Sequence, residues 1–486
     1  MAKVGIVGAG IAGMSAAVHL RAKGHEVTVF EAAAHAGGKL HAIESEGYRF
    51  DAGPSLFTMP HLLDGLFESA GKNPRDYYHY QKIEPGCQYF WPDGTTFSGW
   101  SDSGKFAREA QSVLGVPAKA VEKYFKKSSE LYDITEKVFL RSSLHRWQTY
   151  LRWSTLVSFA QLYNARIFSS MHSVNSRLLR NPKLVQLFDR YATYNGSDPY
   201  QAPGTLTVIP TLEHRWGTFL PKGGMHQITK SLHRLAADIG VNFRFNEAVE
   251  TIAHSAKKVK GIQTTRAFYP FDMVVSNMDV VPTYQKLLKG VAPPANLDRQ
   301  ERSSSALIYY WGVKQTFPQL GLHNILWSDE YESEFKSIFS DKTIGDDPTV
   351  YINITSKHEH ADAPEGCENW FILINAPCDE GQDWKALAEK TRRIIIAKIN
   401  KMLDCDIEPL IETEHILDPP KIGRDTSSFK GSLYGTSSNH WQAAFLRHPN
   451  FSKQIDGLYF CGGSVHPGGG IPLCLLSGKI VSEIAP

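Results

Sequence analysis

The sequence predicts a mixed α/β fold, and three observations support this prediction. A short apolar run at Lys3–Val7 passes directly into a glycine-rich turn and then into a helical pattern over residues 14–23. Glu26–Phe30 follows as a second apolar strand. The order strand, glycine turn, helix then recurs over residues 457–484. A strand that feeds a helix through a tight turn is typical of parallel α/β sheets.

Composition narrows the class of protein. A chain of 486 residues has room for about two or three domains. It is 42% hydrophobic and 21% charged, which is typical of globular proteins, and its net charge of +2 argues against a dedicated nucleic-acid binder. Its 6 cysteines form no CxxC pair, so neither a disulfide scaffold nor a structural zinc site is expected. Without a spanning apolar run or a signal peptide, we expect a cytoplasmic protein, soluble or attached peripherally to a membrane.

The first turn, at residues 8–13, has the spacing GxGxxG. Gly8 permits the tight turn, Gly10 allows the backbone to approach a pyrophosphate, and Gly13 allows the helix to lie close to the strand. Glu31 follows the second strand, where a carboxylate can accept hydrogen bonds from ribose hydroxyls and would repel a 2′-phosphate. These residues together predict dinucleotide binding without NADP.

A second glycine pair, Gly37–Gly38, precedes Lys39. It suits a second approach of the backbone to a pyrophosphate, with Lys39 as a point charge. A plain glycine loop with a solvated lysine explains the same residues equally well.

From this point the sequence resembles a known family, the phytoene desaturase-type carotenoid desaturases, which are flavoproteins of the amine-oxidase-like superfamily. The resemblance begins with Gly37–Lys39, Phe50–Ser55 and Met59–Pro60 and continues in family order along nearly the whole chain. The later motifs lie at 194–200, 221–225, 276–279, 431–434 and 458–473. The most specific is His466-Pro-Gly-Gly-Gly-Ile-Pro472, and the residues that follow it are closer to the hydroxycarotenoid 3,4-desaturase branch. Lys39 and Lys222 depart from the family, which more often has arginine there.

The resemblance implies a Rossmann-like FAD-binding domain with an inserted α+β substrate domain. The FAD-binding domain would be discontinuous, over 1–75, 220–285 and 420–486. Residues 76–219 and 286–419 would form the domain that binds the substrate and associates with the membrane. The activity implied is an FAD-dependent desaturation in carotenoid biosynthesis, namely the 3,4-desaturation of a 1-hydroxylated or monocyclic carotenoid, with phytoene desaturation as the alternative.

Motifs and resemblance together give the candidate cofactor contacts. Near the C-terminus, residues 457–461 predict a strand, a glycine-rich loop follows, and 474–484 predict a helix. Such a loop offers backbone donors to a ribityl chain and a flavin ring, and a glycine-rich closing turn is the alternative that the other motifs disfavour. The candidates are Gly8, Gly10, Gly13, Glu31, Gly38, Lys39, Pro54, Ser55, Leu56, Val249, Asn277, Leu433, Gly462, Gly463, Gly470, Ile471 and Pro472.

The central part of the chain predicts further strands at 241–245, 260–264 and 273–276, with 246–252 continuing the first. In flavoproteins of this type such strands cover the adenine end, and the resemblance implies a backbone contact at Val249. From the pattern alone, Val249 is equally a core valine.

On the substrate side, residues 137–188 hold eight Lys or Arg and no Asp or Glu, among apolar and aromatic residues at helical spacing. This pattern suits a helix at a membrane interface, where cations attract anionic headgroups. An internal amphipathic helix with a wet basic face is the alternative. A carotenoid needs a long apolar tunnel, and the runs at 308–311 and 370–374 are either tunnel walls or buried strands.

The chemistry expected is the removal of two hydrogens from adjacent carbons, for which FAD supplies a hydride acceptor. No catalytic triad is required, and GxSxG, HExxH and P-loop motifs are absent from the sequence. His466 and Tyr434 are weak acid/base candidates, each with a structural role as the alternative. His358-Glu-His360 favours an exposed loop over a metal site, so no metal is predicted.

Two other classes share features of this pattern. One is a protoporphyrinogen- or amine-oxidising flavoenzyme, which the central and C-terminal motifs disfavour. The other is a non-catalytic lipid carrier of the Rab GDP-dissociation-inhibitor type, which the glycine motifs at both ends disfavour. The sequence leaves open the electron acceptor, oxygen or a quinone, the number of double bonds introduced and the oligomeric state.

Overall fold

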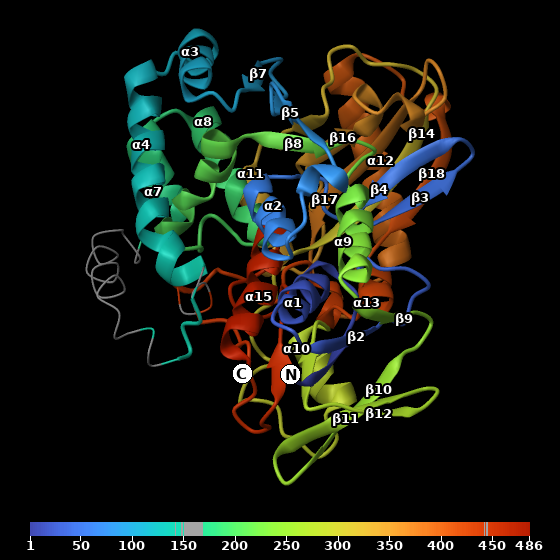
Figure 1. Cartoon of the computed structure of the whole chain (residues 1–486). Helices are drawn as coiled ribbons and strands as arrows, with labels where there is room; N and C mark the ends of the chain where they lie inside the picture. Colours follow the sequence, from blue (N-terminus) through green and yellow to red (C-terminus); the bar gives the residue numbers. More distant parts are fainter. Residues whose placement is uncertain (141, 147–148, 150–168, 442, 444–445) are drawn as a thin grey trace.

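A parallel sheet of five strands carries the N-terminal motif in the computed structural model of the chain (Figure 1), which describes residues 1–140, 142–146, 149, 169–441, 443 and 446–486. The strand order is β19 (Leu458–Phe460), β13 (Met273–Ser276), β1 (Lys3–Val7), β2 (Glu26–Phe30) and β9 (Asn242–Arg244). All neighbours pair in parallel. The sheet therefore unites both ends of the chain with its central part.

Helices cover one face of this sheet and a small antiparallel sheet covers the other. The helices are α1 (Ile11–Ala22), α9 (His226–Asp238) and α15 (Ile471–Ile484). The small sheet contains β10 (Val249–Ser255), β11 (Lys258–Thr264) and β12 (Phe268–Pro270). Helix α15 lies against α1 because Gly478 has no side chain; a Cβ there would be 2.7 Å from the Ala12 carbonyl oxygen.

A second, mostly antiparallel sheet has seven strands. Its order is β18 (Ile411–Leu417), β14 (Ser305–Val313), β17 (Glu368–Ala376), β16 (Val350–Ile354), β15 (His323–Leu326), β6 (Cys87–Phe90) and β7 (Thr96–Gly99). Two antiparallel pairs accompany it: the hairpin of β3 (His41–Ser45) and β4 (Tyr48–Ala52), and β5 (Tyr80–Ile83) with the distant strand β8 (Thr218–Pro221). The strands of the large sheet come from the ranges that the sequence assigns to a substrate domain, while the boundaries of that domain remain a proposal.

The remaining helices are α2 (Pro60–Ser69), α3 (Ser103–Leu114), α4 (Ala118–Thr135), α7 (Met171–Leu179), α8 (Pro182–Asp189), α10 (Val280–Pro282), α11 (Tyr331–Phe339), α12 (Trp384–Leu403) and α13 (Pro419–Thr426). Of these, α2 packs against α1 and α15 in the core beside the first sheet. Figure 1 shows α3, α4, α7 and α8 gathered at one end of the molecule. Their apolar faces share a core with β6 and β15 that is rich in aromatic side chains.

The predicted strands of the nucleotide-binding unit are confirmed, with differences at the ends of the helices. Helix α1 begins at Ile11, before the predicted start at residue 14. Helix α15 begins at Ile471, before the predicted start at 474, because proline is well accommodated in a first helical turn. The strand predicted over 246–252 is confirmed for residues 249–252, which begin β10, whereas its continuation from the preceding strand through 246–248 is wrong. Asn246 has a φ of 52°, which turns the chain from β9 to β10 in a different sheet.

The aromatic runs at 308–311 and 370–374 lie in neighbouring strands of the large sheet. Strand β14 pairs with β17, with Ile308 opposite Leu373. Alternate residues point to opposite faces of a strand, so Ile308, Tyr310 and Leu373 line a cavity while Tyr309 and Trp311 fill a core on the other face. The runs are therefore buried strands, as one of the two alternatives had it, and one face of them lines the cavity; that this face is a tunnel wall for the substrate stays a prediction.

The basic aromatic stretch at 137–188 is only partly described, because residues 141, 147–148 and 150–168 lie outside the described residues. Its last part forms α7 and α8, whose apolar residues are buried in the aromatic-rich core. The internal interpretation is thus correct for residues 171–188. Among the described residues, none of the helices combines the length and apolar character needed to cross a bilayer.

Candidate cofactor and substrate site

A cavity of about 1420 Å³ extends from the glycine loops of the parallel sheet to the face of the large sheet. Small-ligand pockets usually measure about 300–1,000 Å³, so this cavity has room for a dinucleotide and part of a second long ligand. All candidate cofactor contacts except Gly13 line it. At its far side the wall includes Ile308, Tyr310 and Leu373.

The first glycine loop packs closely against the protein on one side and faces the cavity on the other. Gly8 has a φ of 93°, which favours glycine. A Cβ on Gly13 would lie 2.2 Å from the Gly8 carbonyl oxygen, so Gly13 sets the approach of α1 to the strand although it does not touch the cavity. Among the described residues, no side chain caps the N-terminus of α1, which leaves its first amides available to an anion.

The side chain of Glu31 is hydrogen-bonded to this loop. Its carboxylate accepts hydrogen bonds from the amides of Ala9 at 2.8 Å and Ala33 at 2.9 Å. Each carboxylate oxygen keeps a further lone pair for a ribose hydroxyl. The Glu31 carbonyl also accepts from the Glu247 amide at 3.0 Å, which brings the segment before Val249 to the same edge of the cavity.

The second glycine pair packs on the first. The amide of Gly37 donates to the Ala9 carbonyl at 2.9 Å, and a Cβ on Gly38 would lie 3.5 Å from the Gly10 Cα. The backbone at Gly37–Gly38 therefore lies beside the first glycine loop, as a second approach to a pyrophosphate requires. Lys39 turns away from the loop, and its Nζ donates to the Leu433 carbonyl at 2.7 Å and the Ser432 carbonyl at 3.3 Å. Burial lowers the pKa of Lys39 to about 8, and the carboxylate of Asp279 opposes that shift.

Asn277 joins the first and last glycine loops. It follows β13, and its Nδ2 donates to the Gly8 carbonyl at 3.4 Å. A Cβ on Gly462 would lie 3.0 Å from the Asn277 Oδ1, so the C-terminal loop can approach only because Gly462 is glycine. Gly463, Gly470, Ile471 and Pro472 continue this wall, and Pro54, Ser55 and Leu56 line the cavity between β4 and α2.

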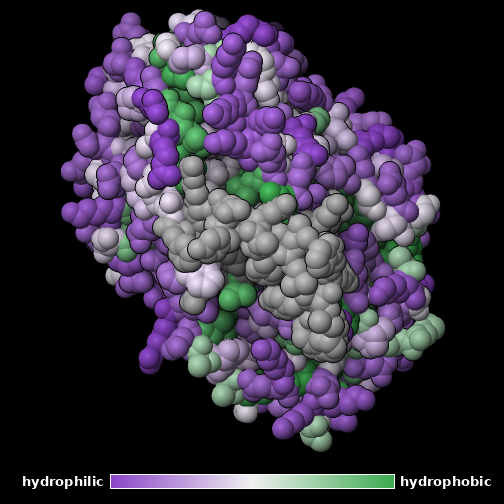
Figure 2. Space-filling model, turned by 90° about the vertical axis from the view of Figure 1, so that its left-hand side faces the viewer, coloured by the Kyte–Doolittle hydropathy of each residue, from purple (hydrophilic) through white to green (hydrophobic). Residues whose placement is uncertain are grey.

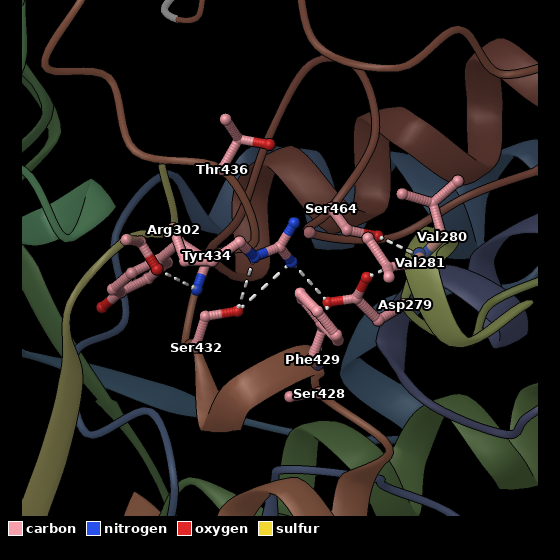
Figure 3. Close-up of polar contacts among 12 residues, drawn as sticks. Asp279, Val280, Val281, Arg302, Ser428, Phe429, Ser432, Tyr434, Thr436 and Ser464 are labelled. Atoms are coloured by element: carbon pink, nitrogen blue, oxygen red, sulfur yellow. Dashed lines mark hydrogen bonds and ion pairs between the residues drawn. The ribbon is translucent and has the colours of Figure 1, made fainter. Parts of the chain in front are cut away.

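A buried ion pair fixes the loop that carries Leu433 and Tyr434. Figure 3 shows the Arg302 guanidinium between Asp279 and Ser432. Its Nη2 lies 2.7 Å from the Asp279 carboxylate, and both side chains are almost inaccessible, at 4% and 7% exposure. Asp279 also accepts from the amides of Val281 and Phe429. The loop after β13 is thereby held to residues 429–434.

Tyr434 packs between two glycine segments. A Cβ on Gly196 would lie 2.9 Å from its ring, and a Cβ on Gly469 would lie 2.7 Å from its Cδ1. Burial raises the pKa of Tyr434 to about 12, so its hydroxyl is neutral at physiological pH. This placement explains why the central motif and the C-terminal motif both contain glycine.

His466 is a neutral imidazole with a structural contact. Its Nε2 donates to the Ser142 carbonyl at 2.9 Å. Burial lowers its pKa to about 3, with the nearby His145 adding to the effect. At neutral pH the ring therefore holds the loop to residue 142, and only Nδ1 has a free lone pair.

Several cavity residues carry no sequence signal. Arg447 is buried and donates through Nη1 to the carbonyls of Tyr434 at 2.6 Å and Gly463 at 3.1 Å. Arg190, His323 and Tyr351 also line the cavity, and the Tyr351 hydroxyl lies 2.7 Å from Ser55 Oγ. No motif singles out these residues, because their role depends on strands and helices that meet only in the folded chain. His358 and His360 lie outside the cavity lining, and no metal-binding cluster of three His, Cys, Asp or Glu occurs within the described part of the chain.

These features fit FAD. The uncapped helix N-terminus and the two stacked glycine turns suit a pyrophosphate, and Glu31 suits a ribose. The C-terminal glycine loop offers backbone groups along the cavity wall toward Tyr434.

Comparison with known proteins supports the same assignment. Residues 11–306 match the family model described as flavin containing amine oxidoreductase. The chain is 50% identical over 486 residues to a 1-hydroxycarotenoid 3,4-desaturase of Flavobacterium sp., covering 100% of this chain and 99% of the relative. It is 32% identical to a 4,4'-diapolycopene oxygenase of Methylomonas sp., covering 99% of this chain and 97% of the relative.

Solved structures with low sequence identity share the fold. An oxidoreductase from Methanosarcina mazei has a TM-score of 0.65 at 15% identity, with 99% of this chain and 100% of that chain covered. A putrescine oxidase has a TM-score of 0.66 at 12% identity, with 99% and 98% covered. These likenesses confirm the predicted amine-oxidase-like fold. The chain therefore belongs to the flavin-containing amine oxidoreductase family, and within it this protein is an FAD-dependent oxidoreductase of the carotenoid desaturase type.

Proposed function

We propose that this protein introduces the 3,4 double bond into a carotenoid that carries a hydroxyl group on C1. The observation that carries this proposal is the 50% identity, over the full length of both chains, to a relative named for that reaction. The cavity supports it, because it continues from the cofactor loops along an apolar sheet face. Bound FAD supplies hydride acceptance from the bond to be oxidised.

The chain's own residues bind FAD and orient it. We infer that the amides of α1 and the two glycine turns hold the pyrophosphate, and that Glu31 and the segment at Val249 hold the adenosine. Pro54, Ser55, Leu56, Leu433, Gly462, Gly463, Gly470, Ile471 and Pro472 would enclose the flavin. Tyr434 and His466 would shape and hold this wall, because each has a structural contact and neither carries a charge at neutral pH.

The test is expression in cells that produce acyclic carotenoids, with and without a 1-hydroxylated or monocyclic end group. We expect a longer-wavelength pigment only with the hydroxylated or monocyclic precursor. Conversion of colourless phytoene would place the protein at the first desaturation steps and contradict the branch assignment. An oxygenated product from an unmodified end would instead indicate the chemistry of the relatives named as oxygenases, which are more distant.

We also propose that the protein binds a membrane surface peripherally, where an insoluble carotenoid is available. Two large apolar side chains, Trp441 at 41% and Leu446 at 49% exposure, flank residues outside the described part of the chain. The start of the basic stretch lies beside this pair, because His145 hydrogen-bonds to the backbone of Arg447, and the next residue, Arg146, is exposed. In Figure 2, hydrophobic atoms of described residues are visible around the grey region on this face.

The membrane proposal is tested by flotation with vesicles that contain anionic lipid. The double variant Trp441→Glu and Leu446→Glu should shift the protein to the unbound fraction. Val113→Glu changes an equally exposed apolar residue on the distant helix α3 and should leave binding intact. Equal binding of both variants would contradict the proposed surface.

The electron acceptor is a separate question. Measuring oxygen consumption and quinone reduction during turnover will show which of the two accepts the electrons.

A further inference from the structure

The wall of the cavity becomes polar beside the segment 54–56. Ser55, Arg190, His323 and Tyr351 all line the cavity there and form what we call the buried polar cluster. They come from four places in the chain: the loop after β4, the end of α8, strand β15 and strand β16. His323 is 3% exposed and Arg190 is 8% exposed, so the cluster lies in the interior of the protein.

The direction of the hydrogen bonds in the cluster follows from Asn353. Its Nδ2 donates to the Leu322 carbonyl at 3.0 Å and lies 3.2 Å from His323 Nδ1. An amide nitrogen can only donate, so Nδ1 is an acceptor and the proton of the neutral ring is on Nε2. Burial lowers the pKa of His323 to about 3, which keeps the ring neutral.

The remaining bonds form a relay from the cofactor side of the cavity. The Tyr351 hydroxyl lies 2.7 Å from His323 Nδ1 and 2.7 Å from Ser55 Oγ. Because Nδ1 accepts, Tyr351 donates to it and in turn accepts from Ser55. Ser55 Oγ is therefore left with free lone pairs, in a residue of the segment predicted to contact the flavin.

Two donors of the cluster have no partner among the described residues. They are Nε2 of His323 and Nε of Arg190. The other nitrogens of Arg190 are engaged, since Nη1 donates to Tyr194 at 3.2 Å and Nη2 to Tyr89 at 3.0 Å. A buried donor without an acceptor is unfavourable, because it has lost its hydrogen bonds to water and gained none in return.

A hydrocarbon end group cannot pair with these atoms, whereas a hydroxyl group both donates and accepts. In a 1-hydroxylated carotenoid only C2 separates the oxygen-bearing C1 from C3 of the bond to be oxidised. An oxygen site for that substrate must therefore lie next to the flavin, which is where Ser55 places the cluster.

We propose that the buried polar cluster binds the oxygen of the substrate's 1-hydroxyl group and so selects a hydroxylated end. The hydroxyl donates to Ser55 Oγ and accepts from an unpartnered donor of the cluster, while Tyr351 and His323 orient Ser55. This inference rests on the proposed 3,4-desaturase function. It makes Ser55 a specificity-determining residue and Tyr351 and His323 positioning residues.

The test compares two acyclic carotenoids that differ only in the 1-hydroxyl group, each supplied in phosphatidylcholine vesicles to the FAD-loaded protein. The measured quantity is the ratio of the two kcat/KM values. Tyr351→Phe and Ser55→Ala should each lower the ratio of kcat/KM for the hydroxylated carotenoid to kcat/KM for the other about 10- to 100-fold. Binding of each carotenoid is also measured without oxygen, from the absorption band of the bound polyene. Both variants should lose the wild-type protein's tighter binding of the hydroxylated carotenoid.

Tyr309→Phe is the matched control. Its hydroxyl is also buried in the large sheet, but it donates to the Ala388 carbonyl at 2.6 Å on the face away from the cavity. This variant should keep the wild-type ratio, and all three variants should retain the flavin spectrum.

The outcomes separate the inference from the proposed function. An unchanged ratio in both Tyr351→Phe and Ser55→Ala overturns the inference, as does a wild-type protein that desaturates both carotenoids equally well. A wild-type protein that converts neither carotenoid contradicts the proposed function itself. If Tyr351→Phe fails to load FAD, Ser55→Ala decides alone, because it removes only a small partly buried hydroxyl.

Discussion

The Nζ atom of Lys39 lies 2.7 Å from the carbonyl oxygen of Leu433, a residue 394 positions later in the chain. This contact joins the second glycine turn to the loop that carries Tyr434. It places a partly buried ammonium group in the wall of the cofactor cavity, with Asp279 as a nearby carboxylate. Lys39 is therefore both a link between two segments and a source of positive charge for an anionic ligand.

Lys39 gives a prediction about pH. Its pKa is about 8, so the apoprotein loses this charge as the pH rises through 8. A protonated Lys39 favours the anionic FAD, and the affinity for FAD should fall about tenfold between pH 7 and pH 9.5. Titration of the apoprotein with FAD, followed by quenching of flavin fluorescence, measures this. Lys39→Met should bind more weakly at pH 7 and show a flat profile; an equally steep profile in that variant would exclude Lys39 as the cause.

Glu31 gives a second prediction about FAD. Glu31→Ala removes the acceptor for a ribose hydroxyl and for the amides of Ala9 and Ala33. We expect the Kd for FAD to rise at least about tenfold, as for the loss of a charged hydrogen-bond partner. Glu26→Ala, at the exposed start of the same strand, is the control and should bind FAD normally. Unchanged affinity in Glu31→Ala would show that Glu31 does not hold the adenosine.

Gly13 gives a prediction about packing. Gly13→Ala places a Cβ 2.2 Å from the Gly8 carbonyl oxygen, so α1 must move away from the strand. The expected cost is about 1–3 kcal/mol of folding free energy together with weaker FAD binding. Gly65→Ala adds the same atom inside α2, where nothing lies within 4 Å, and should be neutral or slightly stabilising. Urea denaturation of both variants compares the two sites; equal stability would contradict the close approach.

The buried ion pair of Arg302 and Asp279 gives a prediction of non-additivity. Arg302→Leu leaves the carboxylate of Asp279 buried without its partner and should cost about 3–5 kcal/mol. Adding Asp279→Asn to that variant removes the uncompensated charge and should restore part of the loss. A double-mutant cycle by chemical denaturation measures the coupling, and additive losses would mean that the two side chains act independently.

His466 gives a prediction about acid stability. Its pKa is about 3 in the folded protein against an ordinary value of 6.5, so below pH 6.5 the unfolded chain binds a proton that the folded protein does not. The stability contribution is complete above pH 6.5 and is lost as the pH falls toward 3, by up to about 1.4 kcal/mol per pH unit. His466→Gln keeps a donor for the Ser142 carbonyl and should flatten this decline. Thermal unfolding of the FAD-loaded protein from pH 7 to pH 4 checks the slope, and identical slopes would show that His466 already titrates normally.

The sequence by itself determined the nucleotide-binding unit and the family. The strands Lys3–Val7, Glu26–Phe30 and Met273–Ser276 were predicted with their observed bounds, because buried parallel strands are short apolar runs bounded by turns. The glycine motifs also mark positions at which a Cβ would collide with the backbone, as at Gly13. The sequence shows this constraint directly, because only glycine lacks a Cβ.

Only the tertiary structure decided how the substrate end of the cavity is built. Ser55, Arg190, His323 and Tyr351 meet there from four separate places in the chain, and of these only Ser55 belongs to a motif that the sequence shows. The partner of Lys39 is likewise a backbone carbonyl, which any residue at position 433 could supply. Local periodicity reports which face of an element is buried, whereas the contacts of a polar side chain depend on which distant elements pack beside it.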